Sequence, residues 1–164
     1  QAIAGGVYIN SGLFESISPE EKDEKIKKGE SYVDNALKVN DKNKFALESK
    51  GICRTYFKDD LNAKYFLKNA IAADSNYTGP YNNLGIAHRN LGEIDSALIY
   101  FGIAMEKEEL FSYPANNFVQ MLVLQKRYNS VDSTLNVLQN RFPKNTDLSD
   151  KIYNWKFNRQ WTQF

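Results

Sequence analysis

The residue types that most often carry catalysis are scarce in this sequence. It holds one histidine, His88, and one cysteine, Cys53. A catalytic nucleophile needs a base within hydrogen-bond reach and a metal site needs several ligands, so one residue of each type makes neither arrangement. Gly5 and Gly6 are not followed by the lysine and hydroxyl residues of a phosphate-binding loop. We therefore expect no enzyme, no metal and no cofactor, with His88 a half-buried packing residue and Cys53 a small buried one.

Asparagine side chains follow a regular spacing. Asn82 and Asn116 are 34 residues apart, and so are Asn83 and Asn117. A side-chain amide both donates and accepts a hydrogen bond, so a row of amides suits the backbone of an extended peptide. Asparagine can equally well solvate an exposed helix, and the spacing alone does not decide between these two roles.

The composition excludes two classes of partner or environment. With 164 residues, 42% hydrophobic and 25% charged, the chain is about one ordinary soluble globular domain. Its 21 basic and 20 acidic residues leave a net charge of +1, which argues against nucleic-acid binding. The longest apolar stretches, such as residues 97–105, are much shorter than the ~20 residues of a transmembrane helix.

The cellular compartment stays open. A single cysteine closes no disulfide within the chain and so says nothing about redox conditions. The first residue is Gln1 rather than methionine, which fits a processed mature end or a piece of a longer protein. A cytoplasmic protein and a periplasmic or secreted one after removal of a signal peptide both agree with these features.

Apolar and small residues repeat along the chain with the same 34-residue step as the asparagines. Several positions in phase indicate a true repeat. Within each repeat, apolar residues recur at i, i+3, i+4 and i+7 on either side of a short polar break, which predicts a hairpin of two helices. The positions in phase are Ala63, Ala97 and Val131; Leu67, Phe101 and Leu135; Ala70, Ala104 and Leu138; and Gly51 and Gly85.

The best-marked helix begins after Ser18. Pro19 fits a first helical turn and Glu21 completes a capping box with Ser18, so we expect a helix from there to about Val39. Its polar side carries acidic residues four positions before lysines, and we expect a solvated face with modest ion pairs, a docking patch being the alternative. The pairs are Glu21 with Lys25, Asp23 with Lys27, and Glu24 with Lys28.

The residues from 78 to about 111 resemble a tetratricopeptide repeat (TPR). Its signature positions hold Tyr81, Leu84, Gly85, Ala97, Phe101 and Ala104. The repeat at 44–77 departs from this pattern with Lys50 and Arg54, where leucine and tyrosine are usual. The repeat at 112–145 is looser and keeps Phe118, Tyr128, Leu135, Leu138 and Pro143.

The resemblance implies an all-α fold, a right-handed α-solenoid of about three TPR hairpins with an extra N-terminal helix or partial repeat and a C-terminal capping helix. Leu148, Ile152 and Trp155 form the apolar stripe expected of that last helix. Residues 1–14 are expected to pair with the helix after Ser18, although their double glycine opposes helix formation. The expected divisions are 1–43, 44–77, 78–111, 112–145 and 146–164.

The same resemblance implies a function and a site. The chain is expected to be a non-catalytic scaffold or adaptor for a protein partner, with a peptide segment bound in the concave groove along the first helices of the hairpins. Only Asn83 matches the residues with which some TPR proteins grip a chain-terminal carboxylate, so a polar, weakly charged peptide is the expected ligand. The groove positions are Phe45, Glu48, Ile52, Asn82, Asn83, Ile86, Arg89, Asn90, Asn116, Asn117 and Gln120.

Two other functions stay open at this stage. A structural subunit could assemble through the aromatic C-terminus, where Trp161 and Phe164 lie beyond the capping stripe, unless these residues pack back on the last hairpin. A small-ligand or catalytic role would depend on His88. The sequence identifies neither the partner nor the oligomeric state.

Overall fold

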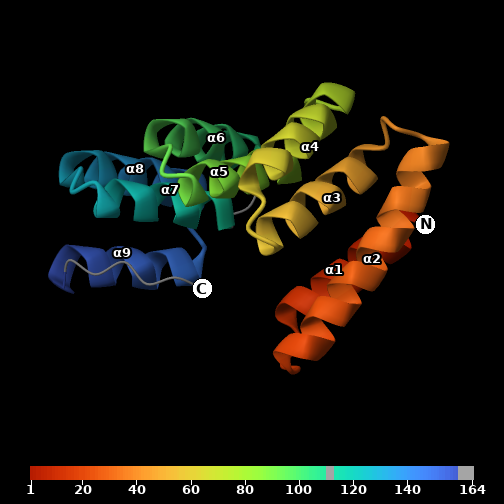
Figure 1. The fold of residues 1–164 in the computed structure, drawn as a ribbon. Helices are drawn as coiled ribbons and strands as arrows, with labels where there is room; N and C mark the ends of the chain where they lie inside the picture. The colour runs from red at the N-terminus through yellow and green to blue at the C-terminus, as the bar shows by residue number, and fades with distance from the viewer. Residues whose placement is uncertain (110–112, 159–164) are drawn as a thin grey trace. The chain divides into compact units, whose positions relative to one another are not determined.

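The computed structural model describes residues 1–109 and 113–158, and within these ranges the chain forms nine α-helices and no strand (Figure 1). This is the all-α, TPR-like solenoid fold that the 34-residue period predicts, with two helices in each repeat. The helices are α1 (Ala2–Phe14), α2 (Pro19–Val39), α3 (Lys44–Tyr56), α4 (Asp60–Ala73), α5 (Gly79–Asn90), α6 (Ile94–Lys107), α7 (Tyr113–Leu124), α8 (Tyr128–Arg141) and α9 (Thr146–Asn158).

The start of α2 has the predicted capping box. The Ser18 side chain accepts a hydrogen bond from the Glu21 backbone N–H at 3.2 Å, and the Ser18 backbone N–H donates to the Glu21 carboxylate at 3.1 Å. Pro19 is the first residue of the helix, where its missing N–H costs no hydrogen bond. Both ends of α2 therefore lie where the sequence predicts them.

The predicted ion pairs along α2 are wrong. Among the described residues, none of the three acid–lysine pairs forms an ion pair, and three of the six side chains contact residues outside α2 instead. Lys25 pairs with Glu15, and Asp23 accepts a hydrogen bond from the Tyr56 hydroxyl at 2.6 Å. The Lys28 ammonium lies 4.9 Å from the centre of the Tyr8 ring.

Glycine residues let α1 pack closely beside α2 (Figure 1). A β-carbon on Gly5 would lie 2.9 Å from the Gly29 carbonyl oxygen, and one on Gly29 would lie 2.8 Å from the Gly5 oxygen. Such an approach is closed to any residue with a side chain. Ile9 and Val33 pack beside this crossing and are at most 1% exposed. Gly5 thus weakens the helix locally but permits the close contact that holds α1 against α2.

The chain divides into two compact units, residues 1–93 and 94–164, and each is described by itself. In the first unit, α1, α2 and α3 share a core that includes Ile26, Val33 and Cys53. Cys53 is fully buried, and this burial raises the pKa of its thiol to about 12, so the thiol stays protonated. Gly51 makes room for α4, since a β-carbon there would lie 2.5 Å from the Leu67 side chain.

In the second unit the repeated apolar positions form the core. Phe101, Val131 and Leu135 are at most 1% exposed. Trp155 of α9 is fully buried, and its indole N–H donates to the Asp132 carboxylate at 2.7 Å. Leu148 and Ile152 are buried with it, so the stripe predicted from its i, i+4, i+7 spacing is the inner face of α9.

The period also appears in the backbone of the turns. Lys58, Gly92 and Lys126 are spaced 34 residues apart and have φ values of 62°, 75° and 56°. Each lies in the turn that follows the first helix of a hairpin. Glycine adopts this left-handed conformation readily, whereas lysine adopts it at a cost of roughly 1 kcal/mol.

Candidate functional site

Two of the predicted groove residues, Glu48 and Asn83, contact each other. The Asn83 amide on α5 donates to the Glu48 carboxylate on α3 at 3.0 Å, and the Tyr77 hydroxyl donates to its other oxygen. A β-carbon on Gly79 would lie 2.2 Å from the carboxylate, so a glycine at this position lets the acid fit against the start of α5. Burial raises the pKa of Glu48, and the two hydrogen bonds oppose that rise.

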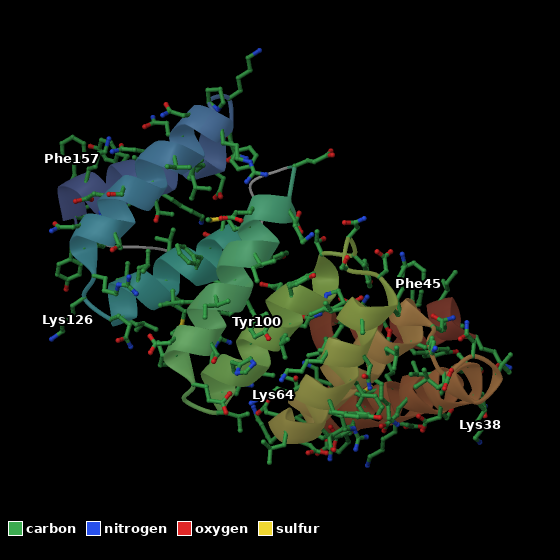
Figure 2. The ribbon with its side chains drawn as sticks, turned by 90° about the horizontal axis from the view of Figure 1, so that it is seen from above. Lys38, Phe45, Lys64, Tyr100, Lys126 and Phe157 are labelled. Atoms are coloured by element: carbon green, nitrogen blue, oxygen red, sulfur yellow. The ribbon has the colours of Figure 1, made fainter. Side chains whose placement is uncertain are left out.

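The start of α3 carries an aromatic pair next to this acid. Phe45 is 48% exposed on the surface of the first unit (Figure 2), and its ring meets the Tyr77 ring edge-on with centroids 5.2 Å apart. The Lys44 ammonium lies 5.0 Å from the Phe45 centroid and 5.2 Å from the Tyr77 centroid. It also bonds Asp74, whose pKa is lowered by that hydrogen bond. The charges of Lys44 and Asp74 therefore compensate each other.

The remaining groove positions of the first unit have different environments. Ile52, Asn82, Ile86 and Arg89 are half-buried, and Ile52 packs against the core of α1, α2 and α3. Asn90 is turned toward α4, where its amide donates to the Asp60 carboxylate at 3.1 Å.

The groove positions of the second unit all lie on α7. Asn117 and Gln120 are half-buried, and Asn116 is only 5% exposed. Both polar atoms of the Asn116 amide and the Oε1 atom of Gln120 are buried, and none has a hydrogen-bond partner within the described part of the chain. A buried polar group left unpaired costs about 1–3 kcal/mol, so these atoms, which lack a partner among the described residues, are candidates to receive hydrogen bonds from a ligand. The tail residues Trp161 and Phe164 lie outside the described residues.

His88 is buried more deeply than predicted, at 6% exposure. Its Nδ1 atom contacts the Glu93 carboxylate, which also binds the Lys64 ammonium at 2.6 Å. Burial lowers the pKa of His88 more than the Glu93 contact raises it, so the neutral ring is favoured. These contacts tie the end of α5 to α4, which is a structural role.

Lys50 and Arg54, the two departures from the TPR pattern, have a structural explanation. The Lys50 ammonium lies 2.8 Å from the Glu30 carboxylate and 2.6 Å from that of Asp34, both on α2. Arg54 also pairs with Glu30. Sequence reasoning missed this network. The available signal was that Glu30 and Asp34 lie four residues apart and so share one face of α2, as Lys50 and Arg54 do on α3.

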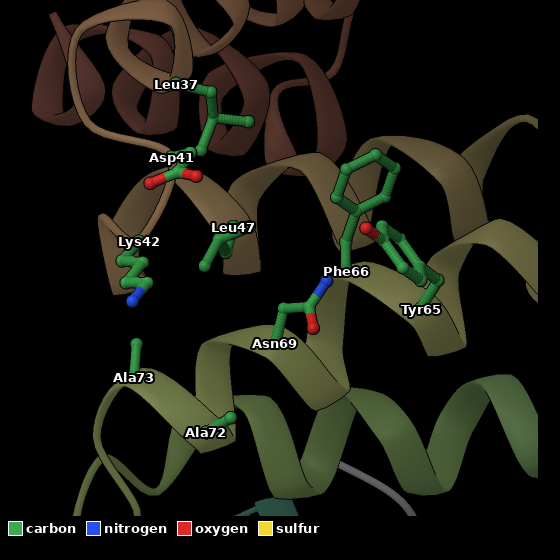
Figure 3. Close-up of a pocket in the computed structure, with 9 residues that line it drawn as sticks. All are labelled: Leu37, Asp41, Lys42, Leu47, Tyr65, Phe66, Asn69, Ala72 and Ala73. Carbon is green, nitrogen blue, oxygen red and sulfur yellow. The ribbon is translucent and has the colours of Figure 1, made fainter.

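Sequence reasoning also missed an open hollow in the first unit. Its volume is about 530 Å³, and Figure 3 shows Leu37 of α2 and Asp41 of the turn after it on the opposite side from Phe66 and Asn69 of α4. None of the predicted groove residues lines it.

Two further observations bear on the class of protein. No described helix is both long and apolar enough to cross a bilayer. Over residues 1–109 and 113–158, no three or more histidine, cysteine, aspartate or glutamate side chains are grouped so that they could hold a metal ion.

Comparison with known proteins concerns the fold. No protein-family model and no curated protein matches the sequence. The structure is similar to the crystal structure of a thermophilic TPR protein from Thermus thermophilus, with a TM-score of 0.64 and 13% sequence identity. The similarity covers 93% of this chain and 89% of that one. The protein therefore has the fold of a tetratricopeptide repeat protein.

Proposed function

We propose that the protein is a non-catalytic scaffold that binds an extended, polar segment of a partner protein through the amide side chains of its repeats. The TPR fold supports a role in protein interaction, because stacked hairpins present extended binding surfaces. The contacts proposed for this segment are the groove positions on α7 in the second unit, and the groove positions on α3 and α5 are proposed as a separate contact surface of the first unit.

The unpaired amides of α7 carry this proposal. Asn116 and Gln120 are one helical turn apart, and together they hold three buried polar atoms without a hydrogen-bond partner among the described residues. A peptide backbone offers an N–H and a C=O at each residue, which are the groups that these amides lack. Binding would recover the free energy that folding loses at these side chains.

The chemistry around Glu48 indicates the charge of a segment bound by the first unit. Glu48 and Arg89 are the only charged groove positions, and Glu48 already accepts hydrogen bonds from Tyr77 and Asn83. Its carboxylate is therefore poorly placed to attract a strongly basic segment. A polar, weakly charged peptide fits these positions better.

The test uses peptides selected from a random displayed library against the purified 164-residue chain, with affinities measured by calorimetry. Asn116→Leu should raise the Kd of a selected peptide by at least about tenfold, the effect of losing about 1.4 kcal/mol. The same change should leave the melting temperature unchanged or higher, because it removes an unpaired buried amide.

Asn136→Leu is the matched control, because Asn136 is an exposed asparagine of α8 outside the predicted groove. It should leave the Kd unchanged. An unchanged Kd in Asn116→Leu, or a library that yields no peptide, would contradict the proposal. A chain ending at Phe157 should bind as the full chain does, and loss of binding only in that chain would move the function to the aromatic tail.

A further inference from the structure

The open hollow of the first unit, lined by α2, α3, α4 and the turn after α2, has the size of a small-molecule site. Its volume of about 530 Å³ lies within the range of roughly 300–1,000 Å³ that is usual for such sites. Leu37 and Leu47 form apolar parts of its wall, and Leu47 is only 5% exposed. On α4 it is bordered by Ala72 and Ala73, whose side chains are too short to fill it. The hollow is therefore large enough to receive a small organic molecule.

Two opposite charges lie at one end of the hollow. Asp41 and Lys42 are consecutive residues of the turn between α2 and α3, and both are exposed. Over residues 1–109 and 113–158, neither side chain forms an ion pair or a hydrogen bond, with the other or with a third residue. No group of the described chain therefore competes with a ligand for these two charges.

Aromatic side chains lie at the other end of the hollow (Figure 3). Tyr65 and Phe66 of α4 contact each other edge-on, with ring centroids 5.2 Å apart. Another aromatic ring packs favourably beside such a pair, either edge-on or offset. The Asn69 amide lies between the charged and the aromatic end (Figure 3), where it can donate or accept a hydrogen bond. The hollow thus combines a charged end, an amide and an aromatic end.

The two charges indicate the class of ligand. A ligand with a single charge would meet the opposite charge at one of these residues and a like charge at the other, so that much of the attraction would cancel. A zwitterion that carries an ammonium and a carboxylate group on one carbon atom offers a partner to each residue. Both contacts are then charge-assisted hydrogen bonds, which are stronger than neutral ones.

We propose that the hollow binds a small zwitterion that carries an aromatic ring, as a free aromatic amino acid does. The Asp41 carboxylate accepts a hydrogen bond from the ammonium group of the ligand, and the Lys42 ammonium donates to its carboxylate. The aromatic ring of the ligand packs against Phe66. This site is separate from the proposed peptide-binding positions, because none of them lines the hollow.

Titration of the isotope-labelled 164-residue chain with L-phenylalanine, followed by nuclear magnetic resonance, tests the proposal. The backbone amide signals of Asp41, Lys42 and Asn69 should shift and saturate with a Kd of about 1 mM or tighter, as a ligand of this size allows. Phenethylamine lacks the carboxylate and hydrocinnamate lacks the ammonium group, so each should bind at least about tenfold more weakly. Signals that do not saturate, or three ligands that bind equally well, would overturn the proposal.

Substitutions at the charged end test the same contacts from the side of the protein. Asp41→Asn and Lys42→Gln should each raise the Kd of L-phenylalanine at least about tenfold, because each removes one charge-assisted hydrogen bond. Asp150→Asn and Lys38→Gln are the matched controls, since both residues are exposed and lie outside the hollow. They should leave the Kd unchanged. All four residues are exposed, so the circular dichroism of each variant should match that of the wild type.

A filled hollow gives a third readout. Ala72 is an exposed residue of α4 that lines the hollow, and Ala72→Phe should abolish binding by occupying the space while leaving the helix intact. Binding of L-phenylalanine that survives Ala72→Phe would overturn the proposal. So would a Kd that Asp41→Asn and Lys42→Gln raise no more than their controls do.

Discussion

At the scale of single residues, Glu48 illustrates what position in a repeat can and cannot predict. The resemblance to TPR proteins assigned Glu48 and Asn83 to one groove, and the structure joins them by a hydrogen bond of 3.0 Å. The sequence did not indicate that the Asn83 amide is already committed to this carboxylate. That contact depends on side-chain rotamers and on the space left by Gly79, which the spacing of residues along the chain does not report.

The buried carboxyl of Glu48 should make stability fall as pH rises. Burial raises its pKa above the ordinary 4.5, so the folded protein holds this proton more tightly than the unfolded chain. The resulting stabilisation is fully present at pH values below the pKa of this carboxyl in the unfolded chain. It is lost as pH rises through the pKa of the carboxyl in the folded protein. The free energy of unfolding of the wild type, measured with urea, should therefore decline relative to that of Glu48→Gln from pH 4.5 upward.

Glu106→Gln serves as the control for this pH series, because Glu106 is exposed on α6. The free energy of unfolding of the wild type relative to that of Glu106→Gln should not decline with pH in this way. A wild type that gains stability over Glu48→Gln as pH rises would contradict the inference, because the two hydrogen bonds would then outweigh burial.

At the scale of elements, local patterns were the most informative part of the sequence. The capping box at Ser18 and Glu21 and the apolar periodicity predicted helices from contacts within a few residues of chain. The ion pairs of α2 failed, because Lys25 and Asp23 find partners on other elements. Lys50 and Arg54 were recognised as unusual, but their partners on α2 could not be inferred without knowing how the helices stack.

The double glycine of α1 should respond unequally to alanine. A β-carbon on Gly5 meets the backbone oxygen of Gly29 at 2.9 Å, so Gly5→Ala must separate α1 from α2 and should cost about 2 kcal/mol. On Gly6 it meets only the Ser49 hydroxyl at 3.3 Å, so Gly6→Ala should be neutral or stabilising by up to about 1 kcal/mol. Urea unfolding followed by circular dichroism measures both. Equal effects would show that the glycine contact does not hold α1 in place.

At the scale of the whole molecule, the division into residues 1–93 and 94–164 was not foreseen from the sequence. The 34-residue period is the same for every repeat, whereas the contacts between residues are not equally dense along the chain. In a repeat protein, stability is a sum of local terms and of terms between neighbours, so an uneven array can unfold in parts.

The two units should unfold in separate transitions. Both tryptophans, Trp155 and Trp161, belong to residues 94–164, so tryptophan fluorescence reports the second unit alone. Gly5→Ala should lower the midpoint of the circular dichroism transition that belongs to the first unit and leave the fluorescence midpoint in place. Leu135→Ala, in the core of the second unit, should shift the fluorescence midpoint. Equal shifts of both signals in Gly5→Ala would instead mean that the chain unfolds as one cooperative body.

The left-handed turns at Lys58, Gly92 and Lys126 have a consequence for how such a chain can change length. The same backbone conformation recurs at each 34-residue step, although the residue that adopts it differs. A duplication or deletion of one whole repeat in the gene would therefore bring an equivalent turn into the same place. The array can grow or shrink by a repeat without having to evolve a new connection.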